Sequence, residues 1–134
     1  MRLSNERYGE IKDEAINMLV QYKICSIPII GFNVAEKLGI DVFPYSFLPN
    51  DKKEQTCVVS KDGLYCVDFS GKDNIFYNDE MSKERVNMTI LHEIAHCVLG
   101  HHDGMTDEEK ESEAGFFAKY VIAPPPLMAL KIFV

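Results

Sequence analysis

The sequence lacks a run of about 18 consecutive apolar residues, which is the length that a membrane-spanning helix needs. It also lacks the apolar core of a secretory signal peptide, because the N-terminus becomes charged at Arg2 and again at Glu6. Internal repeats and low-complexity segments are absent as well. From these features we expect a cytoplasmic protein that does not enter a membrane.

Cysteines are few, and no two of them form a C-x-x-C pair. They are Cys25, Cys57, Cys66 and Cys97, at spacings that give no tight disulfide framework. Without an export signal, we expect them to be reduced and mostly buried thiols. Cys57 and Cys66 are the two that a predicted hairpin would bring face to face, and the sequence leaves open whether they pair.

Positive charge is also scarce. Only 14 Lys and Arg residues stand against 21 Asp and Glu residues, for a formal net charge of −7. Nucleic-acid binding needs a basic face, so we expect no direct contact with nucleic acid. An acidic surface does suit a basic protein partner. With 134 residues, of which 46% are hydrophobic and 26% charged, the chain fits a single folded domain over 1–134.

The N-terminal part of the sequence predicts two helices. Apolar residues recur at helical spacing over 5–22, and Ser4 is a suitable N-cap for this segment. A shorter helix is predicted over 32–38, ending at Gly39, since glycine favours the conformation that closes a helix. The following residues, 40–53, are predicted to be irregular.

The middle of the chain changes to the pattern of β-strands. Runs rich in β-branched and aromatic residues cover 56–59, 64–69 and 74–77. Lys61-Asp62-Gly63 separates the first two runs and is typical of a hairpin turn, and the segment 70–73 predicts the next turn. We therefore expect a three-stranded, largely antiparallel sheet.

The C-terminal part predicts two more helices, which makes the expected fold class α+β. The first covers 83–99 with Ser82 as its N-cap. The second runs over 106–122 and begins with Thr106 and Glu109 in the spacing of a capping box. The prolines that follow Ala123 prevent this helix from continuing.

The helix over 83–99 carries the sequence His92-Glu93-Ile94-Ala95-His96, an H-E-x-x-H motif. Two histidines four residues apart project from one helix face and can bind one metal ion. Glu93 lies about 100° round the helix, near the metal and free to hold a water molecule. In such a site two neutral imidazoles bind Zn²⁺ and the carboxylate accepts a proton from water, which is the chemistry of a zinc hydrolase.

The residues around the motif support this interpretation, because five residues with three fixed also recur by chance. Apolar residues cover most of the helix circumference, so the helix is expected to be buried. A narrow polar stripe nevertheless follows it, formed by Arg85, Thr89, His92, Glu93, His96 and Gly100. Such a stripe is costly unless its groups are satisfied, as a metal would satisfy the imidazoles. The alternative is a pair of histidines that merely form hydrogen bonds in the core or face solvent.

A catalytic zinc usually has three protein ligands, and Glu113 is the preferred third. It precedes Phe116, Phe117, Tyr120 and Val121 at helical spacing. A carboxylate on that apolar face needs a positive partner, which a zinc ion would be. The alternative is an ion pair with a lysine. Glu109 and Glu111 are interpreted as charges of the first helical turn.

His101 and His102 compete with Glu113 for this role. His102 follows His96 by six residues, as in the metzincin pattern, but that pattern needs glycine where this chain has Leu99. A His-His-Glu site is therefore favoured over a His-His-His site. His101, His102 and Tyr77 remain candidates for contacts to substrate or to the oxyanion, or for alternative ligation. A closed structural site, with His101 or Cys97 as a fourth ligand, is a further alternative.

Two segments resemble the ImmA/IrrE-type zinc metallopeptidases. Residues 85–101 match the signature R-x-x-x-T-x-x-H-E-x-x-H-x-x-L-G-H, and residues 111–118 match E-x-E-A-x-x-F-A, followed by Pro124. The clear similarity covers 75–126. Two features depart from the family: Gly115 stands where relatives often have asparagine, and the chain ends soon after the proline segment, so it is either trimmed or short in its substrate-recognition part.

The resemblance implies a compact zincin-like domain with one Zn²⁺ bound by His92, His96 and Glu113, and with Glu93 as the catalytic base. It also implies an intracellular bacterial protein of phage or mobile-element origin that cleaves or antagonises a helix-turn-helix repressor. We expect an extended substrate to pair with a sheet edge, with 74–78 as the preferred strand. The alternative function is a binding module that keeps the zinc site and controls a repressor or toxin partner without cutting it.

Overall fold

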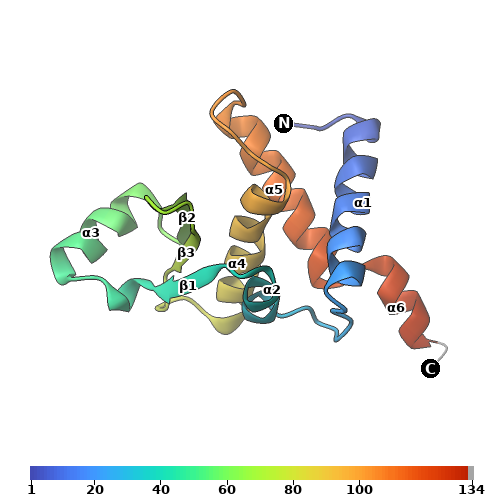
Figure 1. The fold of residues 1–134 in the computed structure, drawn as a ribbon, viewed down its shortest axis with the longest axis horizontal. Coiled ribbons are helices and arrows are strands. Elements are labelled where there is room, and N and C mark those ends of the chain that lie inside the picture. The colour runs from blue at the N-terminus through green and yellow to red at the C-terminus, as the bar shows by residue number, and fades with distance from the viewer. Residues whose placement is uncertain (133–134) are drawn as a thin grey trace.

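The computed structural model describes residues 1–132, and their side chains through Met128 (Figure 1). Its fold is α+β. Along the chain the elements are α1 (Asn5–Gln21), α2 (Gly31–Leu38), β1 (Asp41–Pro44), the 3₁₀ turn η1 (Tyr45–Phe47), α3 (Asn50–Val59), β2 (Gly63–Val67), β3 (Asp73–Tyr77), α4 (Lys83–Val98), α5 (Asp107–Ile122) and α6 (Pro125–Ile132).

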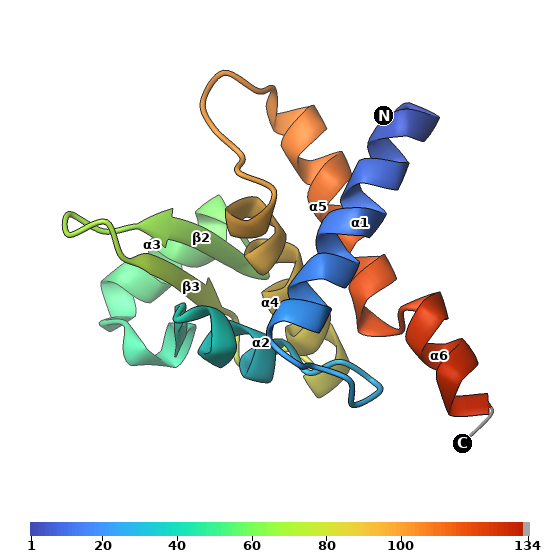
Figure 2. The ribbon, with the colours of Figure 1, turned by 45° about the vertical axis from the view of Figure 1, so that its right-hand side comes forward.

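Helix α4 lies at the centre of the molecule, between the helices α1 and α5 on one side and the sheet on the other. Helix α5 packs along one side of α4, and α1 packs on α5 (Figure 1). The sheet contacts α4 from the other side through β2 and β3, while α3 lies beyond the sheet (Figure 2). The buried residues of α4 include Ile90, Leu91 and Ile94, which are fully enclosed. A helix in this position is apolar on most sides, as the sequence predicts.

The N-terminal helices form where they are predicted. The side chain of Ser4 accepts a hydrogen bond from Arg7 N at the start of α1. Helix α2 ends at Gly39, whose φ of +74° is readily available to glycine. Asn87 of α4 fixes the other end of α2, because its Oδ1 accepts from Gly31 N at 2.6 Å and its Nδ2 donates to Ile29 O at 3.0 Å.

The sheet differs from the prediction in one strand. Its order is β1-β3-β2, with β1 parallel and β2 antiparallel to β3. The predicted strand at 56–59 is instead the end of α3, and Lys61-Asp62-Gly63 leads from that helix into β2 rather than forming a hairpin. The third strand is β1, within the segment predicted to be irregular. The sheet is therefore mixed.

The physical cause lies in the weak strand signal of 56–59. Residues 51–55 are polar and favour a helix that starts after Pro49, and Thr56 to Val59 extend it. Val58 is 88% exposed, so its β-branched side chain gains nothing from a sheet or core. Strand β1 has only four residues and pairs in parallel with a strand some thirty positions later, a pairing that local sequence does not encode.

The remaining predicted elements are confirmed. The hairpin between β2 and β3 turns at Gly71, with a φ of +84°. Strand β2 ends at Val67, so Phe69 lies in this turn and is fully exposed. Ser82 caps α4, and Thr106 with Glu109 forms the capping box of α5. None of the helices described is both long and apolar enough to span a bilayer.

The cysteines are unpaired in the structure, but the expectation that they are mostly buried is wrong. Cys25 and Cys66 are exposed, whereas Cys57 and Cys97 are half-buried. Cys57 lies on α3 rather than on a strand of a hairpin with Cys66, so the predicted face-to-face arrangement does not occur.

Candidate metal and catalytic site

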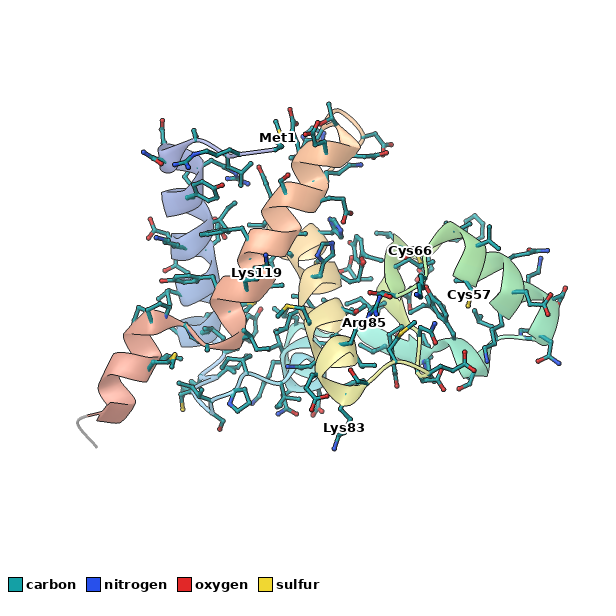
Figure 3. The ribbon with its side chains drawn as sticks, turned by 180° about the vertical axis from the view of Figure 1, so that it is seen from behind. Met1, Cys57, Cys66, Lys83, Arg85 and Lys119 are labelled. Atoms are coloured by element: carbon teal, nitrogen blue, oxygen red, sulfur yellow. The ribbon has the colours of Figure 1, made fainter. Side chains whose placement is uncertain are left out.

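The polar stripe of α4 faces the beginning of β2. Arg85 projects from α4 toward the sheet (Figure 3). Its guanidinium binds the Asp62 carboxylate twice, through Nε to Oδ2 at 3.0 Å and Nη2 to Oδ1 at 2.8 Å. One turn later, Thr89 lies against Gly63, where an added Cβ would come within 2.6 Å of Thr89 Cγ2. Arg85, Thr89 and Gly63 thus hold β2 close to the next turns of α4, which carry the histidines.

His92 and His96 turn their Nε2 atoms toward the same carboxylate, that of Glu111 on α5. His92 Nε2 lies 2.8 Å from Glu111 Oε2, and His96 Nε2 lies 3.4 Å from Glu111 Oε1. The three side chains offer ligand atoms that all lie within 4.8 Å of one another. Two donors of a tetrahedral zinc are separated by roughly 3.4 Å, given bonds of about 2.0–2.2 Å. Two imidazole nitrogens and one carboxylate oxygen at these separations fit a zinc ion.

Glu113, the predicted third ligand, does not lie in this group. The Glu113 side chain is 7% exposed, and its carboxylate is bound by Arg7 of α1, with Nε to Oε2 at 2.8 Å and Nη2 to Oε1 at 2.7 Å. His101 Nε2 is a third partner, 3.0 Å from Oε1. The hydrogen bonds from Arg7 are the main cause that lowers the pKa of Glu113. The positive partner of Glu113 is therefore Arg7. The alternative of an ion pair with a lysine is wrong in the identity of the cation.

Helix geometry explains why Glu111 and Glu113 have different surroundings. Residues two positions apart on an α-helix point about 200° apart. Glu113 precedes the buried Ala114 and Phe117 and faces the core, whereas Glu111 stays exposed on the side of the cleft. The interpretation of Glu111 as a first-turn charge missed its place opposite the histidines. The E-x-E spacing signals that one carboxylate faces the cleft, but it does not say which one.

His101 is held under His96 rather than beside the ligand atoms. Gly100 has a φ of +66°, and His101 N donates to His96 O at 3.1 Å, which is the closing bond of a Schellman motif. The ring then places Nδ1 at 2.7 Å from His96 Nδ1. Both ring nitrogens of His101 are occupied, by His96 and Glu113. His102 lines the cleft but is not part of the His92, His96, Glu111 group, and its Nδ1 accepts from Gly104 N at 3.0 Å.

Glu93 is the buried acid of the site. It is 8% exposed, and its Oε2 lies 3.8 Å from His96 Nε2. Its pKa is raised to about 7, mainly by burial and also by the charge of Glu111. A carboxylate with such a pKa can take a proton near neutral pH and give it up again, as a general base must.

A cleft of about 750 Å³ opens beside Glu93, His96 and Glu111, and His92 lines an adjoining pocket that shares Glu93 and Glu111 with it. The cleft is lined by β2 from Gly63 to Val67 and by Glu93, His96 and His101. Tyr65 lines it and stacks on the His96 ring, with centroids 6.4 Å apart. Its hydroxyl donates to Asp73. Tyr65 was not among the predicted site residues, since a strand tyrosine gives no sequence signal that distinguishes cleft from core.

The sequence matches a known protein family. The model of the IrrE N-terminal-like domain, a peptidase family, matches residues 35–130. The chain belongs to the IrrE N-terminal-like peptidase family. No curated protein and no solved structure gives a significant match.

Membership of the IrrE-like family places the chain in the metallopeptidase class, and it implies a metal ion and a protein substrate. The matched segment contains all of α4 and α5 and the whole sheet, so every residue of the His92, His96, Glu111 group lies within it. Helix α1, which supplies Arg7, precedes it.

Two further candidate residues of this IrrE-like domain are also not brought to the histidine pair. Tyr77 packs edge-on against Phe32 of α2, with ring centroids 5.3 Å apart, and is not among the residues that line the cleft. Cys97, a candidate for a fourth ligand, is not part of the His92, His96, Glu111 group. Burial raises the pKa of its thiol, which does not favour the thiolate that metal binding needs.

Proposed function

We propose that this protein is a zinc-dependent peptidase in which His92, His96 and Glu111 hold one Zn²⁺ and Glu93 is the catalytic base. The observation that carries the proposal is the convergence of three ligand atoms within 4.8 Å of one another, beside a buried carboxylate. Glu111 replaces Glu113 in the ligand set, because Glu113 is already bound by Arg7 and His101.

The reaction is hydrolysis of a peptide bond by water. When bound, zinc acidifies water and polarises the scissile carbonyl. Glu93 accepts the proton of the attacking water and delivers it to the leaving amine nitrogen, which restores the carboxylate. The low exposure of Glu93 supports this role, since it raises the carboxylate's affinity for a proton to the range needed near neutral pH.

The substrate lies along β2 as an additional strand. The expectation that 74–78 receives it is wrong, because β3 is the central strand and is paired on both sides. β2 is an edge strand, and its residues from Gly63 to Val67 line the same cleft as Glu93. An extended peptide there gains main-chain hydrogen bonds and lies within reach of the catalytic base.

The proposed substrate is a helix-turn-helix transcriptional repressor. The support is the similarity of 85–101 and 111–118 to the ImmA/IrrE-type signatures. The cleft adds an electrostatic argument, because its rim carries Asp103, Asp107 and Glu111 against one cation, Lys110. DNA-binding proteins carry basic surfaces that such a rim attracts.

The decisive experiment compares metal content and cleavage in matched variants. Wild-type protein should hold about one zinc per chain by elemental analysis and should cut a repressor encoded beside it when the two are mixed. Glu93→Gln should keep the zinc and lose cleavage, because the ligands remain and the base is gone. Glu111→Gln should lose both, whereas Glu108→Gln, an exposed change on the same helix, should lose neither.

The outcomes separate the two functions under consideration. Cleavage by Glu93→Gln at the wild-type rate would show that Glu93 is not the base. Release of the repressor from its operator by Glu93→Gln, with the repressor intact, would instead support the non-cleaving binding module.

A further inference from the structure

A continuous chain of hydrogen bonds leads from α1 to the back of His96. Arg7 binds Glu113 through two bonds of 2.7 and 2.8 Å, Glu113 Oε1 lies 3.0 Å from His101 Nε2, and His101 Nδ1 lies 2.7 Å from His96 Nδ1. The side chains of His101 and Glu113 are 3% and 7% exposed, so water competes little for these bonds. The chain ends on the ring nitrogen of His96 that faces away from Glu111.

We propose that Arg7, Glu113 and His101 are positioning residues that fix the tautomer and ring orientation of His96 and thereby strengthen metal binding. The inference rests on the proposed function, in which His96 Nε2 is a zinc ligand. Its test has a readout that does not depend on catalysis.

The direction of the hydrogen bonds follows from the anion at one end. The Glu113 carboxylate, paired with the Arg7 guanidinium, can only accept, so His101 Nε2 must donate to it. A neutral imidazole carries one N–H, and His101 Nδ1 is therefore left as an acceptor. His96 Nδ1 must donate to it, which leaves the lone pair of His96 on Nε2. That atom is the one that faces Glu111 and His92.

The opposite pair of tautomers would prevent His96 Nε2 from binding a metal. Without an anion behind it, His101 could place its N–H on Nδ1 and donate to His96 Nδ1. His96 would then carry its own proton on Nε2, in the place where a metal would bind. The Glu113 anion excludes this state, and the left-handed turn at Gly100 holds His101 close enough to transmit the preference.

The position of Arg7 on α1 links this helix to the hydrogen-bonded residues behind His96. Arg7 lies on α1, before the first residue of the family match, whereas the other members lie inside it. Helix α1 packs on α5, and its contact with Glu113 is therefore coupled to the geometry at His96. Docking of α1 and metal affinity should vary together.

Nuclear magnetic resonance of protein labelled with ¹⁵N-histidine tests the proposed hydrogen-bond directions directly. In folded protein without added metal, long-range ¹⁵N–¹H correlations should show the Nδ1–H tautomer for His96 and the Nε2–H tautomer for His101. In Glu113→Gln the preference at both rings should weaken or reverse. An Nε2–H tautomer for His96 in the wild type would overturn the proposal.

Zinc affinity, measured by competition with a chromogenic chelator, is the second readout. Loss of an outer partner of a metal-bound histidine typically costs about 10- to 100-fold in affinity, and we expect this for Glu113→Gln, Arg7→Ala and His101→Leu. His101→Gln should recover part of the loss, because its amide can accept from His96 and donate to Glu113. Glu10→Gln, which changes a 3.7 Å neighbour of Arg7 outside the chain, should have wild-type affinity.

Cobalt substitution separates a change of position from the loss of a ligand. At saturating Co²⁺, the Glu113 and His101 variants should still show tetrahedral absorption bands, whereas His92→Ala should lose them. Wild-type affinity in Glu113→Gln, together with loss of binding in His92→Ala, would refute the positioning chain and leave the zinc site intact. Failure of the wild type itself to bind Zn²⁺ or Co²⁺ would refute the proposed function.

Discussion

Glu93 should lower the folding stability of the protein when the metal is removed by chelation. The residue is 8% exposed, and burial with the nearby charge of Glu111 raises the pKa of its carboxyl group from 4.5 to about 7. The folded state therefore prefers the protonated form. Each pKa unit corresponds to 1.36 kcal/mol, so the ionised form costs roughly 3 kcal/mol at a pH above both values. This cost is absent below the unfolded-state pKa and grows as pH rises from about 4.5 to about 7.

Glu93→Gln removes the charge with almost no change of shape and makes this cost measurable. In urea unfolding followed by circular dichroism, with chelator present, the variant should exceed the wild type by up to roughly 3 kcal/mol at pH 8. At pH 4.5 the two proteins should be nearly equal. Glu14→Gln, an exposed carboxylate on α1, is the control and should show no such pH dependence. A variant that is less stable than the wild type at pH 8 would refute the reasoning.

Two further predictions concern the packing around the site. Gly31→Ala should destabilise the protein by about 1–3 kcal/mol in urea unfolding, because the new Cβ would lie 2.8 Å from Ile90 Cγ2; Gly9→Ala, with nothing within 4 Å, should not. With chelator present, Glu113→Gln should lower the free energy of unfolding by about 1–3 kcal/mol above pH 5. Since Arg7 lowers the pKa of Glu113, this difference should fade as pH drops toward 3, and a pH-independent difference would contradict the ion pair.

Helices α1, α2, α4 and α5 could be predicted because their signals are local, whereas α3 and α6 were missed. Capping residues such as Ser82 and Thr106 and the apolar periodicity of α4 and α5 act within a few positions of one another. The sheet could be predicted only in part. The pairing of β1 with β3 depends on tertiary contact across η1, α3 and β2, and four residues that end in proline carry no strand signal strong enough to predict it.

The candidate site divides in the same way. The convergence of His92 and His96 follows from a spacing of four on one helix, and the burial of Glu93 follows from the apolar surroundings of α4. The choice of the proposed third ligand depends on how α5 is rotated about its axis relative to α4. That rotation is set by which face of α5 packs on α1, so Arg7, more than a hundred positions away, decides the surroundings of Glu113.

The two carboxylates of the E-x-E segment give the candidate site both its proposed third ligand, Glu111, and its support, Glu113. Because they lie two positions apart on the helix, Glu111 points toward the cleft and Glu113 points toward α1. Because both sit on one rigid turn of α5, the ion pair of Glu113 with Arg7 also fixes the rotation that brings Glu111 opposite the histidines. Exchange of the two roles would require α5 to rotate by about half a turn. That rotation would carry Phe117 out of the core, so the packing of the helix enforces the division of labour.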